Sequence, residues 1–78
     1  METFLFTTAF KRPNGEILPG EVSQLNDEFF KFNANDSTYY YFTIKKDESG
    51  NWYWLDGHTA SLDRVMDLGE KIDAFLAL

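Results

Sequence analysis

Aromatic residues at the spacing of β-strands dominate this chain and limit what it can fold into. Its 78 residues include eight Phe, four Tyr and two Trp, and no Cys. A domain of this length buries only about 60–65% of the surface that its unfolded chain exposes. Large side chains therefore have to form the core, because no disulfide can support it. The sequence predicts one folded domain, residues 1–78, rather than a disordered segment.

Four segments have the alternating or aromatic-rich pattern of strands, namely 3–10, 16–18, 38–46 and 52–55. Turn signals separate them. Pro13-Asn14-Gly15 favours a hairpin after the first strand, and 47–51, with Gly50 suited to positive φ, favours another before the last. Pro19-Gly20 is expected to end the second strand or to place it at a sheet edge, because proline has no N–H for the ladder.

The segment 21–35 fits two patterns. Its apolar residues share a helix face when counted in steps of three and four, whereas Phe30, Phe32 and Ala34 share a strand face. The strand is favoured, because Phe is enriched in strands and Asn26-Asp27 indicates a break before them. We expect a turn, then a strand over 28–33, and then a polar turn over 33–37.

The last segment is predicted to be a helix with Ser61 as its N-cap and Asp63 in its first turn. Gly69 in the middle of this helix costs about 1 kcal/mol relative to Ala, which indicates that the helix approaches the sheet closely there. The apolar positions recur in steps of three and four: Leu62, Val65, Met66, Gly69, Ile72 and Leu76.

The expected fold is therefore α+β. It consists of an antiparallel sheet of four to five strands, connected as meander-like hairpins, with the single C-terminal helix packed on one face.

Charge and composition argue against several functions. Thirteen acidic and seven basic residues give a net charge of -6, which disfavours contact with phosphate backbones and anionic lipids, so we expect neither nucleic acid nor membrane as a partner. Without Cys there are no thiolate metal ligands, and the isolated glycines form no phosphate-binding loop. No cofactor is expected. The start of the chain lacks the pattern of a signal peptide, and a cytoplasmic location is expected.

No catalytic set of residues is evident, and we do not expect an enzyme. His58 is the only histidine. Together with Asp56 it is a candidate acid–base pair, but an exposed loop residue without a role, or one that makes local structural hydrogen bonds, is the simpler interpretation.

Three carboxylates, Asp63, Asp67 and Glu70, lie on the predicted helix face opposite the apolar residues. A solvated face is the simplest interpretation, in part because Asp67 and Lys71 form an i,i+4 pair. The functional alternative is an acidic surface on which a basic partner docks.

An aromatic surface is the second candidate site. Alternation assigns Tyr40, Phe42 and Ile44 to the helix side of the sheet, because that set is the more apolar, and leaves large aromatic residues on the opposite face. Coverage of these residues by the curled sheet or by 21–35 is the competing interpretation. The predicted binding surface consists of Tyr39, Tyr41, Trp52 and Trp54.

The function that these features favour is a small non-enzymatic protein-interaction module. It is expected to self-associate or to bind a protein partner, through the aromatic surface or through the acidic helix face, since Tyr and Trp are enriched at protein contacts. The alternative is a module that binds a small ligand or a carbohydrate by stacking it on Tyr and Trp rings.

Overall fold

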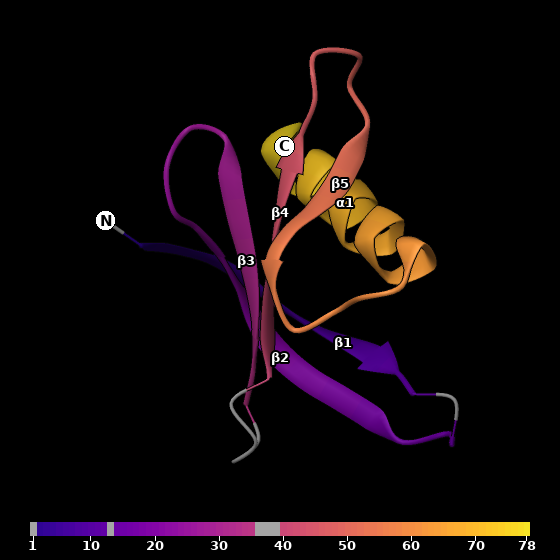
Figure 1. Cartoon of the computed structure of the whole chain (residues 1–78). Coiled ribbons are helices and arrows are strands. Elements are labelled where there is room, and N and C mark those ends of the chain that lie inside the picture. The colour runs from indigo at the N-terminus through magenta and orange to yellow at the C-terminus, as the bar shows by residue number, and fades with distance from the viewer. Residues whose placement is uncertain (1, 13, 36–39) are drawn as a thin grey trace.

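The computed structural model describes residues 2–12, 14–35 and 40–78. In these ranges it has one sheet with strand order β1-β2-β3-β4-β5 and one helix that crosses the sheet next to β5 (Figure 1). Each strand pairs antiparallel with the next, so the predicted α+β meander with a C-terminal helix is confirmed. The elements are β1 (Thr3–Lys11), β2 (Ile17–Gln24), β3 (Phe29–Ala34), β4 (Tyr41–Lys46), β5 (Trp52–Gly57) and α1 (Leu62–Leu76).

Both predicted hairpins are present. In the first, the backbone N–H of Arg12 donates to the carbonyl of Glu16 at 2.7 Å, while Pro13 lies outside the described residues. In the second, Asp47 Oδ1 accepts from the backbone N–H of Asn51 at 2.9 Å. Gly50 has φ +87°, the conformation expected for a bulged hairpin turn. Local turn chemistry therefore sets the connection between β4 and β5.

The predicted effect of Pro19-Gly20 is wrong, because β2 runs through both residues and lies between β1 and β3. The ladder between β2 and β3 ends at the pair Gly20 and Ala34. Pro19 is one residue beyond it, where its carbonyl accepts from the N–H of Asn35 at 2.9 Å. The missing N–H of Pro19 thus falls at the end of the ladder and removes at most one hydrogen bond.

The segment 21–35 is extended, as expected, although its boundaries differ. Residues 21–24 continue β2 instead of forming a turn, and the chain reverses over 25–28 before β3. Asn26 Oδ1 accepts from the N–H groups of Glu28 and Phe29 at 2.8 and 3.0 Å, which is how Asn initiates a turn. Asn33 and Ala34 belong to β3, β4 starts only at Tyr41, and residues 36–39 are outside the described ranges.

The core lies between the sheet and α1. Phe32 pairs across the strands with Phe42, and Phe30 with Ile44, and all four side chains are buried on the helix side. Tyr40 lies on this side too, where its hydroxyl accepts from Arg64 Nη1 at 3.0 Å. The assignment of Tyr40, Phe42 and Ile44 to the helix side is confirmed. The buried apolar residues are Phe10, Leu18, Val22, Phe30, Phe32, Ala34, Phe42, Ile44, Val65, Leu68 and Ile72.

Helix α1 begins as predicted, since Ser61 Oγ accepts from the backbone N–H of Arg64 at 3.2 Å. Its buried face differs from the prediction. Leu68 is fully buried although the apolar series omitted it. Leu62, Met66 and Leu76, which the prediction placed among the packed residues, are exposed, because α1 is rotated so that Val65, Leu68, Gly69 and Ile72 face the sheet.

Gly69 marks a close approach of helix and sheet, as its position in the apolar series predicts. A Cβ added there would overlap the indole ring of Trp52. That ring cannot move away freely, because it also packs edge-on against Phe30, with ring centroids 5.4 Å apart, and donates to Asp73. Gly69 therefore lets α1 lie directly on the edge strand β5.

Gly69→Ala should destabilise the protein even though it raises helix propensity by about 1 kcal/mol. Three atoms of the Trp52 ring are too close to the added Cβ for any ordinary contact, so the overlap should cost about 2–3 kcal/mol, the upper part of the usual range. We therefore expect the free energy of unfolding in urea to fall by about 1–2 kcal/mol, the difference of the two effects. Ala74→Gly, at an exposed helix position, is the propensity control and should lose about 1 kcal/mol. An unchanged or higher stability for Gly69→Ala would contradict the packing described for Trp52.

Candidate functional site

A groove lies between the edge strand β5 and helix α1, and we call it the β5–α1 groove. Its volume is about 370 Å³. The β4–β5 turn closes one end and a continuous stripe of α1 forms one wall. The residues that line it are Gly50, Asn51, Trp52, Leu62, Met66, Glu70 and Asp73.

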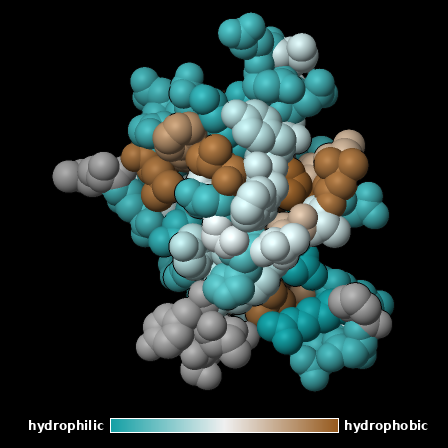
Figure 2. Space-filling model, in the orientation of Figure 1, coloured by the Kyte–Doolittle hydropathy of each residue, from teal (hydrophilic) through white to brown (hydrophobic). Residues whose placement is uncertain are grey.

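The apolar part of the groove is on the first half of α1. Leu62 is 68% exposed and Met66 is 49% exposed, although both are large apolar side chains. Figure 2 shows hydrophobic surface over the first turns of α1, beside the paler surface of β5. Exposed apolar side chains that line a concavity are typical of a contact surface.

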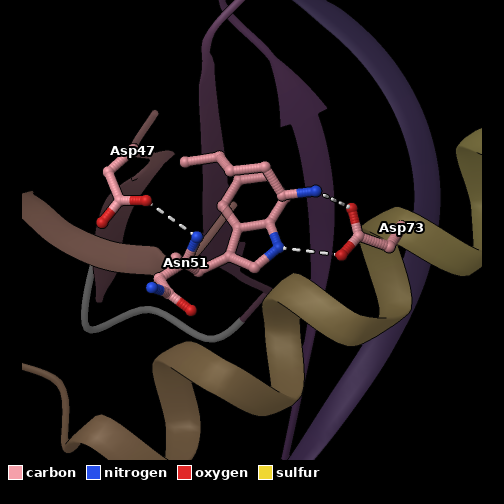
Figure 3. Close-up of polar contacts among 5 residues, drawn as sticks. Asp47, Asn51 and Asp73 are labelled. Atoms are coloured by element: carbon pink, nitrogen blue, oxygen red, sulfur yellow. Dashed lines mark hydrogen bonds and ion pairs between the residues drawn. The ribbon is translucent and has the colours of Figure 1, made fainter. Parts of the chain in front are cut away.

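Trp52 forms the base of the groove on the β5 side. Its ring lies on Gly69, and its Nε1 donates to Asp73 Oδ2 at 3.1 Å. The Lys46 ammonium donates to the other oxygen of Asp73 at 2.7 Å and lies 5.1 Å from the centre of the Trp52 ring. Figure 3 shows both hydrogen bonds reaching Asp73 from the β4–β5 hairpin. One carboxylate thus fixes the hairpin to the last turns of α1.

The pKa of Asp73 is shifted by its surroundings. Partial burial by itself would raise the pKa of Asp73, but the hydrogen bonds from Lys46 and Trp52 and the positive charge of Lys46 outweigh it and lower the pKa below its ordinary value of 3.8. Asp73 is therefore a carboxylate with two donors already in place, whereas Glu70 has no ion-pair partner in the part of the chain that the structure describes.

The four aromatic residues of the predicted surface are not brought together on one face. Tyr39 lies outside the described residues. Tyr41 is on the outer face of the sheet, the face turned away from α1, whereas Trp54 pairs with the buried Ile44 and so lies on the helix side with Trp52. Trp52 lines the groove, and Trp54 is 41% exposed with its Nε1 donating to the carbonyl of His58. Their role in binding stays a prediction.

The outer face carries aromatic residues spaced apart by polar ones. Tyr41 and Tyr53 are 38% and 39% exposed. Tyr41 lies on β4 and Tyr53 on β5. The Lys31 ammonium is 5.1 Å from the ring centre of Tyr41, and Lys45 is paired opposite Tyr53. The prediction that large aromatic residues face outward is met by these two tyrosines rather than by the tryptophans.

The acidic helix residues are at the surface of α1 but border different hollows. Glu70 lines the β5–α1 groove. Asp63 and Asp67 line a shallow hollow on the other side of the helix, together with Lys11 of β1. Asp67 makes the predicted i,i+4 pair with Lys71, with oxygen and nitrogen 3.0 Å apart. Only Glu70 of the three therefore adds charge to the groove.

His58 makes local contacts with the start of β4. Its backbone N–H donates to the carbonyl of Tyr41 at 2.7 Å, and its Nδ1 lies 3.3 Å from the backbone nitrogen of the same residue. The imidazole ring stacks on Tyr40 with centroids 5.1 Å apart. Within the described ranges no hydrogen bond joins His58 to Asp56. His58 therefore makes local structural hydrogen bonds, which is one of the interpretations that the sequence allowed.

Residues 2–12, 14–35 and 40–78 contain no group of three or more His, Asp or Glu side chains placed to hold a metal ion. In the same residues no helix is long and apolar enough to cross a membrane. Comparison with protein-family models, curated proteins and solved structures finds no match for this chain.

Leu62 and Met66 are the site residues that sequence reasoning missed, because the periodic pattern assigned them to the core. The available signal was the width of the apolar arc. At 100° per residue, the step from Leu68 to Met66 spans about 160° of the helix surface, which is more than one sheet contact covers. One side of such an arc has to remain at the surface.

Asp73→Asn should lower the free energy of unfolding by about 0.5–1 kcal/mol at pH 7, since the ion pair with Lys46 is largely exposed and Asn still accepts one hydrogen bond. Because the pKa of Asp73 is lower in the folded than in the unfolded state, its contribution is complete above about pH 3.8 and is lost as the pH falls through the folded value. The difference from the wild type should shrink over that range, as measured by urea unfolding.

Asp67→Asn is the matched control for Asp73→Asn. The two side chains are equally exposed, at 47%, and each pairs with one lysine, but Asp67 has no Trp partner. We expect a smaller loss for Asp67→Asn, of about 0.3–0.5 kcal/mol. Equal losses in both variants, or a loss at Asp73 that persists at the lowest pH, would contradict a special role of Asp73.

Proposed function

We propose that this chain is a non-enzymatic protein-interaction module that holds a segment of a partner protein in the β5–α1 groove. The observation that carries the proposal is the exposure of Leu62 and Met66 in a concavity whose base is Trp52. Trp and Met are among the residue types enriched at protein interfaces, and a pocketed aromatic ring with apolar neighbours is the usual composition of a contact hot spot.

The size of the groove supports a peptide segment as the ligand. A volume of about 370 Å³ is at the lower end of the range for ligand pockets, about 300–1,000 Å³. It accommodates a few side chains of an extended chain, and the groove is open along α1 rather than closed around a small molecule. A peptide segment is thus a better fit than a whole folded surface.

Peptides selected by phage display on the immobilised full chain should depend on the apolar wall of the groove. We expect Met66→Ser to weaken the selected peptides by about tenfold, equivalent to about 1.4 kcal/mol of lost contact, as measured by Trp fluorescence or calorimetry. Ile17→Ser is the matched control, because Ile17 is 62% exposed and lies on β2 outside the groove. It should leave the affinity unchanged.

Two results would count against this function. Selection that enriches no peptide would contradict a peptide-binding module. Equal loss with Met66→Ser and Ile17→Ser would show that the groove is not the site. A carbohydrate panel measured alongside tests the alternative prediction: a saturable fluorescence change with a sugar, and none with peptides, would favour the ligand-binding module.

A further inference from the structure

We propose that the partner segment binds as an additional β-strand on the free edge of β5, and that it is an extended segment with apolar and basic side chains. This inference rests on the proposed function and specifies the binding mode and the chemistry of the ligand. Three features of the described chain carry it: an open strand edge, a helix wall that carries Met66 and Glu70, and an unpaired carboxylate.

The first feature is the free edge of β5. The N–H of Asp47 donates to the carbonyl of Asn51, which fixes the alternation of the β4–β5 ladder. Tyr53, opposite Lys45, then points its backbone groups toward β4, whereas Trp52 and Trp54 point theirs away from it. No backbone hydrogen bond beyond the sheet uses these groups of Trp52 or Trp54 in the described residues. They are available to an added strand.

Each edge strand of the sheet contains one irregularity, which interrupts the pattern that an added strand needs. In β1 it lies between Phe4 and Phe6, and the pairing with β2 is regular from Phe6 to Lys11. In β5 it falls beyond Trp54, and the pairing with β4 is regular from Trp52 to Trp54. We assign the added strand to β5, because Trp52 lines the groove and no described residue of β1 does.

The second feature is the helix wall beside this edge. α1 crosses the sheet next to β5 (Figure 1), and Met66 and Glu70 line the same groove as Trp52. Met66 presents an exposed apolar side chain and Glu70, one helix turn further on, a carboxylate, about 6 Å apart at 1.5 Å per residue. An added strand beside Trp52 would thus meet an apolar and an acidic side chain of α1.

The third feature is charge. Glu70 has no ion-pair partner among the described residues, and the neighbouring Asp73 stays ionised through its contacts with Lys46 and Trp52. A lysine or arginine opposite Glu70 would complete an ion pair next to Met66. A second copy of this chain is the weaker candidate, since each copy has a net charge of -6 and like charges oppose association.

The probe is the peptide acetyl-Thr-Lys-Thr-Val-Thr-Lys-Thr-amide, whose alternate side chains, Lys, Val and Lys, have the same order in either chain direction. Added at millimolar concentration to the labelled full chain, it should slow amide hydrogen exchange at Trp52 and Trp54 at least tenfold, as measured by NMR. Exchange at Tyr53, whose N–H already pairs within the sheet, should change little.

Charge variants test the chemistry of the ligand. Replacement of both lysines of the probe by glutamate should weaken binding at least tenfold, and Glu70→Gln should weaken the lysine peptide about three- to tenfold, more at low salt. Glu48→Gln, in the β4–β5 turn outside the groove, is the matched control and should have no effect.

The outcomes separate this inference from the function on which it rests. Binding that depends on Met66 without slowed exchange at Trp52 and Trp54 overturns strand addition and leaves the interaction module standing. Slowed exchange that appears without peptide, and grows with protein concentration, assigns the edge to a second copy and overturns the inference. Absence of binding by the probe also overturns it, while the display selection decides separately on the proposed function.

Discussion

The contact between the Trp52 ring and Gly69 determines how α1 sits on the sheet. A side chain at position 69 would hold the helix away from β5, and with only hydrogen at that position the helix lies directly on the indole ring. Val65, Leu68 and Ile72 then reach the core without exposed surface. Because the ring is fixed by Asp73 and Phe30 as well, the edge strand and the last turns of the helix form one packed unit.

This placement also explains why apolar side chains remain at the surface. Helix α1 lies against the edge strand β5, and there is no strand beyond β5 to cover the far side of the helix. Leu62 and Met66 lie on that far side and stay exposed. The groove is thus a consequence of the packing that stabilises the fold, and the free backbone edge and the apolar wall are adjacent for the same reason.

Much of the fold could be predicted from local rules. The strand at 3–10, the turn at 47–51, the N-cap at Ser61 and the close approach at Gly69 depend on a few neighbouring residues each, and the structure bears them out. The alternation of the first strand is not kept throughout, because the irregularity between Phe4 and Phe6 places these two residues on opposite faces. Features that depend on the rotation of α1 could not be predicted. The periodicity of the helix is the same whether Leu68 or Met66 faces the core. Only the contact between Gly69 and the Trp52 ring decides which of the two is buried. Pro19 misled the strand prediction because its effect depends on where β3 ends.

The energetics of strand addition favour a transient complex. Each backbone hydrogen bond to the edge of β5 contributes about 0.5–1.5 kcal/mol net, and burial of one valine-sized side chain against Met66 about 1.5–3 kcal/mol. Association of the two molecules costs about 4–15 kcal/mol. The hydrogen bonds along the short regular edge from Trp52 to Trp54 therefore provide little binding free energy beyond this cost. The ion pair at Glu70 and the contact at Met66 therefore decide whether a segment binds, and specificity depends on an apolar and a basic side chain rather than on the buried area.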